Sequence, residues 1–272
     1  MLKAFTLFLR RIRAFVARDY QQAVSYRVEF FMRILTILLV VTTFYFISRI
    51  YAGSTTDFAQ WRDPLAAWIT GLAVLNYFMT GFSSLATAIR NEQMQGTLES
   101  VLLSPISVPV LVVASSAWDL LLATFHSSLY FIFGWLFFGV QFRGNFLLAL
   151  VFLFLTTLVL ACFGIISASV VMIFKRGDPF ALLLGTGSAL FSGVFFPTQL
   201  LGKGFGTLSR FLPPTYGLDG IRRVLIEGQG LTQVTEPLIT LLVYLALMLP
   251  FSLWVFARAV RRAKREGTLI QY

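Results

Sequence analysis

The sequence has very few of the residues from which most metal and catalytic sites are built. Its 272 residues include one cysteine and one histidine. A lone Cys162 excludes an internal disulfide and a cysteine-rich metal cluster, and a lone His126 argues against a histidine metal site. The chain also contains no G-x-S-x-G, H-E-x-x-H or paired acids within one apolar run. We therefore expect neither a metal site nor a catalytic residue.

Charged residues are also scarce. They make up 12% of the chain, about half of the roughly 25% that a soluble protein needs to cover its surface. Hydrophobic residues make up 57%, and the mean hydropathy is +0.80. Too few polar side chains remain to face water around a globule of this size. The composition therefore predicts a protein that is embedded in a lipid bilayer.

The net charge of +10 does not point to nucleic acid. The basic residues lie at the two ends of the chain and beside apolar runs, which is the pattern that anionic lipid headgroups favour. Stacking on bases needs exposed aromatic rings, and most of the 29 phenylalanines lie inside apolar segments. We expect membrane lipid as a partner and no binding of nucleic acid.

Long apolar runs predict an all-α, polytopic membrane protein with six transmembrane helices. A spanning helix needs about 20 mainly apolar residues to cross the hydrocarbon core. Arg33 and Arg49 flank the first span and are expected to snorkel outward from it, and Pro250 should bend the last span. The six expected spans are residues 30–50, 65–89, 108–139, 145–174, 179–196 and 237–257.

The placement of lysine and arginine predicts the orientation of these spans. With six spans both termini lie on one side, and that side would carry 15 of the 22 basic residues. Because basic residues collect on the cytoplasmic side, both termini should be cytoplasmic, and the protein should lie in the inner membrane.

The N-terminal segment, residues 1–27, has a separate pattern. Phe5, Phe8, Ile12 and Phe15 recur at helical spacing, while the arginines fall elsewhere on the helix. This predicts an amphipathic helix in the cytoplasmic interface. Such a helix either anchors the chain or also braces a partner, and the residues leave both roles open.

A second amphipathic segment, residues 91–104, lies between the second and third spans. Met94, Leu98, Val101 and Leu102 fall on one helical face, and Glu92 and Glu99 lie off it. The pattern predicts a short cytoplasmic helix that ends before Pro105. Two acids on an otherwise basic surface are unusual for a passive connection, although a plain connecting helix is the alternative.

Residues 92–105 have the form E-x-x-x-G-T-L-E-x-x-L-x-S-P, which resembles the coupling segment of permeases of type-2 ABC exporters. The stretches 174–179, 192–197 and 212–223 are similar to other parts of the same family, in the same order. The resemblance implies that two permease subunits form a homodimer or a heterodimer, each with an ATP-binding subunit docked beneath it. The implied contacts with that subunit are Glu92, Gln93, Gly96, Thr97, Leu98, Glu99 and Leu102.

The sequence lacks the phosphate-binding pattern G-x-x-x-x-G-K-[ST]. ATP and Mg²⁺ would therefore lie on the partner subunit, and the chain itself would be a permease without a cofactor and not an enzyme. The whole chain, residues 1–272, then forms a single transmembrane permease domain. It would move an amphipathic or lipid-linked molecule, such as a glycan, lipid or drug, outward.

Candidate residues for the path and gate come from three places. Asp119 is expected near the bilayer centre with His126 two turns further on, either lining the path or locking helix packing. Residues 198–236 are expected to form an outer gate or re-entrant region, or else an interfacial helix. Gly185, Gly187 and Ser188 give the fifth span a small face suited to close packing. The candidate gate residues are Phe195, Phe196, Pro197, Tyr216, Arg222 and Arg223.

The alternatives to an ABC permease are an ion-coupled transporter or channel and a lipid-modifying enzyme. An ion-coupled secondary transporter or channel would need intramembrane charges on several helices, and only Asp119 is evident. A membrane-embedded lipid-modifying enzyme would need catalytic groups that the sequence does not offer.

Overall fold

The structure is a computed structural model that describes residues 27–51, 63–96, 108–142, 144–174 and 179–265, together with residues 13, 16–18, 20 and 21. Every regular element in this part of the chain is helical. The long helices are α2 (Arg27–Tyr51), α3 (Pro64–Met94), α5 (Val108–Phe138), α6 (Phe146–Phe174) and α10 (Thr235–Arg265). The shorter ones are α7 (Pro179–Phe191), η2 (Thr198–Leu201), α8 (Gly202–Arg210), α9 (Pro213–Leu225) and η3 (Leu231–Gln233).

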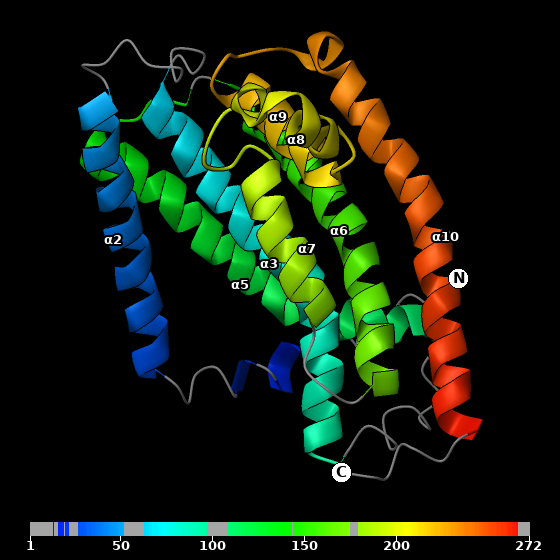
Figure 1. Ribbon diagram of the computed structural model, residues 1–272. Helices are drawn as coiled ribbons and strands as arrows, with labels where there is room; N and C mark the ends of the chain where they lie inside the picture. The colour runs from blue at the N-terminus through cyan, green and yellow to red at the C-terminus, as the bar shows by residue number, and fades with distance from the viewer. Residues whose placement is uncertain are drawn as a thin grey trace.

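Helix α3 is the centre of the bundle. In its most apolar stretch of 18 residues, 78% of the residues are buried, compared with 11% in the corresponding stretches of α2 and α10. Figure 1 shows α2 and α10 at opposite edges, with α5 and α6 alongside α3 between them. Because α2 and α10 expose large apolar side chains such as Leu39 and Trp254, their outer faces suit lipid.

The helix count confirms five of the expected spans. Among the described residues, five helices are long and apolar enough to cross a membrane, namely α2, α3, α5, α6 and α10. Helix α7 was expected to reach residue 196 but ends at Phe191, and its 13 residues extend only about 20 Å. The chain turns at Gly193, whose φ of 85° is accessible mainly to glycine, so the apolar residues beyond it do not extend the helix.

Two glycines allow α3 and α6 to touch along their backbones. A Cβ atom built on Gly164 of α6 would collide with the carbonyl oxygen of Gly81 on α3, and would lie 3.0 Å from that of Phe82. Small residues of this kind bring membrane helices into direct backbone contact. The sequence predicts close packing for the fifth span as well, and there a Cβ atom on Gly185 of α7 would lie 2.8 Å from the sulfur of Met79 on α3, whereas Gly187 meets no described atom within 4 Å.

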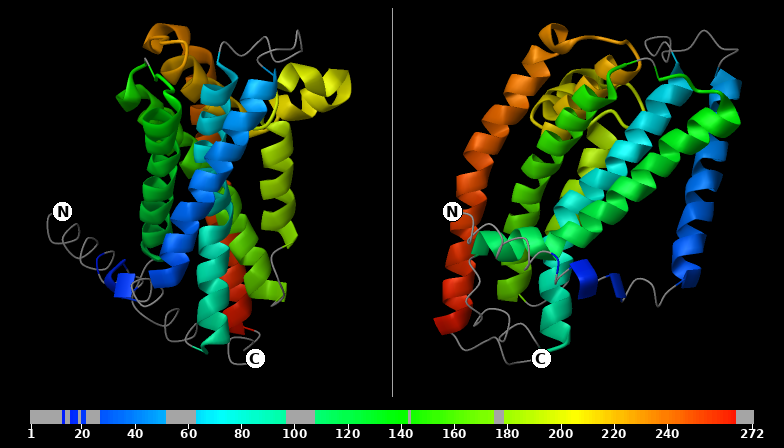
Figure 2. Two further views of the ribbon diagram at one scale, coloured as in Figure 1. Left: turned by 90° about the vertical axis from the view of Figure 1, so that its left-hand side faces the viewer. Right: turned by 180° about the vertical axis from the view of Figure 1, so that it is seen from behind.

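Helix α5 does not run straight through the bundle. Its first turns cross the base of the molecule before the helix rises beside α3 (Figure 2). Asp119 lies about three turns into this helix.

The region 198–236 folds as a helical layer across one end of the bundle (Figure 1). In α9, Leu218, Ile221 and Leu225 are buried, as their helical spacing predicted. In α8, Phe205 and Leu208 remain exposed. One helix of this layer thus closes the core, while the other presents apolar side chains outward.

Candidate functional site

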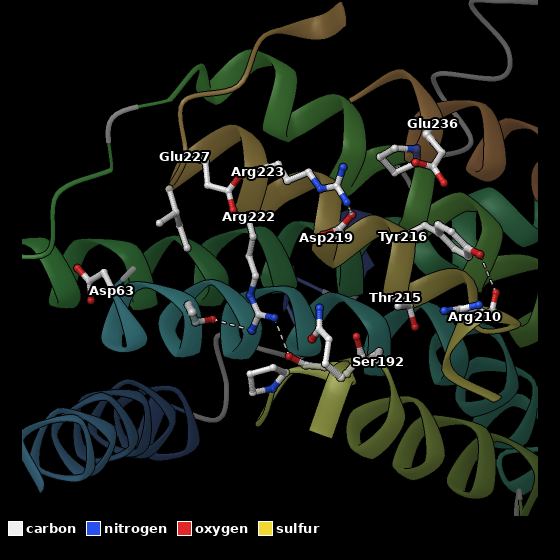
Figure 3. A pocket seen from close by; sticks show the side chains of 17 residues that line it. Asp63, Ser192, Arg210, Thr215, Tyr216, Asp219, Arg222, Arg223, Glu227 and Glu236 are labelled. Atoms are coloured by element: carbon white, nitrogen blue, oxygen red, sulfur yellow. Dashed lines mark hydrogen bonds and ion pairs between the residues drawn. The ribbon is translucent and has the colours of Figure 1, made fainter. Parts of the chain in front are cut away.

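A cavity of about 610 Å³ lies under the helical layer, and we call it the outer pocket, after the side of the membrane on which the sequence predicts this layer. Its walls come from the start of α3, the turn after α7, and helices α8, α9 and α10 (Figure 3). Helix α3 begins there because Asp63 accepts a hydrogen bond from the backbone amide of Ala66 at 3.0 Å and Pro64 occupies the first turn. The charged lining residues are Asp63, Arg210, Asp219, Arg222, Arg223, Glu227 and Glu236.

Arg222 joins three parts of the chain at the floor of this pocket. Its guanidinium donates hydrogen bonds to the carbonyl oxygens of Ala67 on α3 (2.9 Å), Gly193 (2.7 Å) and Val194 (3.2 Å). Figure 3 shows the side chain reaching from α9 toward α3 and the turn. Burial lowers the pKa of Arg222 to about 9, so the group remains protonated at neutral pH. Arg222 thus fixes α9 and the turn after α7 against α3.

The neighbouring Arg223 has a different environment. It forms an ion pair with Asp219 one turn earlier at 2.8 Å, and both side chains are partly exposed. Burial raises the pKa of Asp219, while the charge of Arg223 opposes that rise. Tyr216 donates a hydrogen bond to the carbonyl oxygen of Arg210 at 2.8 Å, which links α9 to the end of α8.

The structure separates the candidate gate residues into two groups. Pro197, Tyr216, Arg222 and Arg223 line the outer pocket. Phe195 instead packs against Phe44 on α2, with ring centroids 6.4 Å apart, and its carbonyl oxygen accepts a hydrogen bond from Trp68 at 2.7 Å. Phe196 does not line the outer pocket. Asp119 and His126 lie on α5, which contributes no wall to this pocket.

The acids and amides of the expected coupling segment begin on α3 itself. Glu92 and Gln93 occupy the last turn of α3 rather than a separate helix, and Gly96 follows with φ of 70°, a conformation that ends helices. Gln93 is buried, and its Oε1 has no hydrogen-bond partner among the described residues. Thr97, Leu98, Glu99 and Leu102 lie outside the described residues.

The end of α3 is tied to the N-terminal segment. Arg18 donates a hydrogen bond to Glu92 at 2.7 Å in an ion pair whose acid is 12% exposed. Close by in sequence, Tyr20 contacts Trp118 of α5 edge to face, with centroids 5.6 Å apart. The described part of the N-terminal segment therefore bridges α3 and α5 where the segment between them begins and ends.

The family of the chain follows from its match to one family model. The model for the ABC-2 type transporter covers residues 7–226, which is most of the chain and includes the end of α3 and the outer pocket apart from Glu227 and the wall contributed by α10. The chain belongs to this family. No curated protein matches the chain. ABC-2 membrane subunits are permeases that lack the ATPase, so hydrolysis is carried out by an ATP-binding subunit, and the permease itself carries no cofactor.

Several residues of the two regions of this ABC-2 permease were not singled out from the sequence. Asp63, Arg210 and Glu236 line the outer pocket, and Arg18 holds Glu92. The Asp63-Pro64 pair does have the sequence pattern of a helix start, an aspartate cap followed by a proline. The other contacts join residues far apart in the chain, and no local pattern announces them.

The ion pair at the end of α3 leads to a first prediction. Replacing Glu92 by alanine should make cleavage by trypsin after Arg18 faster, because Arg18 loses the carboxylate that holds it. Thermal stability should change by less than about 1 kcal/mol, since Arg18 is half exposed. Limited proteolysis of the purified permease measures the rate. Glu227→Ala, at the opposite end of the bundle, is the control, and equal cleavage in both variants would contradict the prediction.

Proposed function

We propose that this ABC-2 permease is the transmembrane half of an ATP-driven exporter that carries an amphipathic or lipid-linked molecule outward across the inner membrane. Two permease subunits would form the complex, with an ATP-binding subunit beneath each. Helix α7 would make the sixth crossing, short as it is, so that both termini lie in the cytoplasm.

The end of α3 carries this proposal. Helix α3 is the most buried of the long helices and continues past its apolar part to Glu92 and Gln93. A push on residues 91–104 would therefore reach the centre of the bundle through a continuous helix. The Arg18–Glu92 pair would transmit the same push to the N-terminal segment. This arrangement supports coupling to an ATP-binding subunit through Glu92, Gln93, Gly96, Thr97, Leu98, Glu99 and Leu102.

The outer pocket supports a release site at the other end of α3. Arg222 bonds to the first turn of α3 and to the turn after α7, so a shift of α3 would also shift the wall of the pocket. Tyr216, Pro197 and Arg223 would then form the gate through which the cargo leaves. The mixed charges of the pocket suit a polar headgroup better than an acyl chain.

Charge reversal in the coupling segment tests the proposal. Glu99→Lys should reduce ATP-dependent movement of a fluorescent phospholipid from the inner leaflet by at least about tenfold, while the ATP-binding subunit continues to hydrolyse ATP. The reason is that the variant loses one contact worth about 1.5–3 kcal/mol between permease and partner.

The assay uses the permease and its copurified ATP-binding subunit in proteoliposomes. Asp57→Lys makes the same charge change in the connection between α2 and α3, far from the coupling segment in sequence and not one of the residues assigned to the gate, and should transport normally. Unaltered transport by Glu99→Lys would remove the coupling role from this residue.

A further inference from the structure

A second cavity, of about 420 Å³, lies between α2, α3 and α5, and shares no lining residue with the outer pocket. We call it the inner cavity. Its lining residues are Glu29, Met32, Arg33, Thr36, Ile37, Asn76, His126 and Tyr130. Four of these side chains carry a charge, an imidazole or an amide, although the cavity lies beside helices suited to cross a membrane. Glu29 and Arg33 are exposed and His126 is buried, and such a group of side chains beside membrane-crossing helices is a candidate ligand site.

The inner cavity lies beside the first three turns of α2, toward its N-terminal end. Ile37, Val41, Leu65 and Ile69 form a buried cluster that seals α2 against α3 further along. Below this seal, Phe31 and other apolar residues of α2 are exposed. The cavity is therefore closed toward the outer pocket and bordered by lipid-facing side chains on the N-terminal half of α2.

Hydrogen-bond donors converge on the inner cavity from α2, α3 and α5. His126 is 5% exposed, and its Nε2 makes no hydrogen bond in the part of the chain that the structure describes. The amide of Asn76 is held in place by hydrogen bonds to the carbonyl of Ala123 (3.2 Å) and the hydroxyl of Ser127 (3.3 Å). A buried nitrogen without a partner is unfavourable, and an oxygen of a bound ligand would satisfy it.

The two charges on α2 add a second constraint. Glu29 and Arg33 lie one helical turn apart, a spacing at which a glutamate and an arginine commonly pair. Within the described residues they form no ion pair, and both line the inner cavity. Arg33, which is exposed near the N-terminal end of α2, borders this cavity together with His126 and Tyr130. A positive and a negative group side by side match a ligand that carries both charges.

We propose that the inner cavity binds the zwitterionic headgroup of a phospholipid-like molecule from the cytoplasmic leaflet, with phosphate on Arg33 and His126 and amine on Glu29. The guanidinium and the imidazole donate to phosphate oxygens, and the hydroxyl of Tyr130 provides a further donor. The acyl chains stay in the lipid beside α2. This inference rests on the proposed function and orientation, and names the class of cargo as an aminophospholipid.

The test measures binding separately from transport. The purified complex in detergent is titrated with dioctanoyl phosphatidylethanolamine, and bound lipid is counted by native mass spectrometry. Arg33→Gln should weaken binding about ten- to hundredfold, because one charge-assisted contact is lost. Arg33→Lys keeps the positive charge and should therefore lose less binding affinity than Arg33→Gln. Arg49→Gln, at the other end of the same helix, should bind like the unmodified chain.

Two comparisons separate the headgroup from other ligands. Dioctanoyl phosphatidylglycerol, which lacks the amine, should bind more weakly than phosphatidylethanolamine, and Glu29→Gln should remove that difference. Inorganic phosphate in millimolar excess should not displace the lipid. Displacement by phosphate would assign the cavity to a free anion and overturn the proposal, as would equal binding by Arg33→Gln and Arg49→Gln.

The outcome also distinguishes this inference from the proposed function. If the ATP-binding subunit copurifies and Glu99→Lys uncouples it, but Arg33→Gln binds phosphatidylethanolamine normally, only the inner-cavity proposal fails. If no ATP-binding subunit copurifies, the proposed function fails regardless of lipid binding.

Discussion

Replacing Arg222 by leucine is expected to destabilise the permease by roughly 3–5 kcal/mol, because the buried guanidinium holds three backbone carbonyls. The guanidinium donates hydrogen bonds to the carbonyls of Ala67, Gly193 and Val194, and leucine leaves all three acceptors without that donor. The turn after α7 and the first turn of α3 would lose their common partner. The apparent melting temperature of the purified protein, followed by fluorescence-detected size exclusion, measures the loss.

The neighbouring arginine is the matched control. Arg223→Leu removes a partly exposed ion pair with Asp219, which is worth less than about 1 kcal/mol. Arg222→Lys should recover only part of the stability, because an ammonium cannot reach three separate carbonyls with the geometry of a guanidinium. Equal melting temperatures for the two leucine variants would show that Arg222 does not hold this end of the bundle.

Replacing Gly164 by valine is expected to cost about 3 kcal/mol or more, because α3 and α6 must move apart. The new Cβ would collide with the carbonyl oxygen of Gly81, which belongs to the backbone and cannot rotate away. Helix α3 is the central helix, so a shift at this point also displaces the residues that line both cavities. The yield of monodisperse protein and its melting temperature are the measurements.

Gly187→Val on α7 provides the comparison for this variant. No atom lies within 4 Å of a Cβ at Gly187, and valine is a better helix former than glycine. Its free energy of unfolding should stay within about 1 kcal/mol of that of the unmodified protein, with a correspondingly small change in melting temperature. If Gly164→Val proved equally stable, the backbone contact between α3 and α6 would not be a determinant of the fold.

The spans could be predicted because lipid imposes one simple requirement on sequence, an apolar run of about 20 residues. The fourth run was expected at 145–174, and α6 occupies Phe146–Phe174 with Asn145 capping its first turn. The last helix extends beyond the expected residue 257 to Arg265, because a helix can continue into the basic tail after it leaves the membrane. A hydropathy profile marks the part of a helix that lies in the membrane, but it does not show where the helix itself ends.

The fifth span shows where hydropathy misleads. Residues 192–196 are as apolar as the helix before them, yet Gly193 turns the chain and Arg222 binds the carbonyls of Gly193 and Val194. The turn depends on a residue 29 positions away. The sequence around residue 193 includes the glycine but gives no sign that Arg222 will bind its carbonyl oxygen.

The cavities could not be predicted for a similar reason. Glu29 and Arg33 were visible as charges near a span, but Asn76 and His126 join them only because α2, α3 and α5 adopt particular rotations about their axes. The contact between Gly81 and Gly164 likewise joins two helices through residues 83 positions apart. Sequence patterns identify which faces are polar or small, and packing decides which faces meet.

In the proposed function, the segment after α3 faces the cytoplasm and receives work from an ATP-binding subunit. The most direct test places a cysteine at Ser100 in a Cys162→Ala background and applies a bifunctional thiol cross-linker to inside-out vesicles. We expect a cross-linked product with the ATP-binding subunit that forms in inside-out vesicles and not in right-side-out ones. Labelling of this cysteine only from the outside, or no cross-link to any ATP-binding subunit, would contradict it.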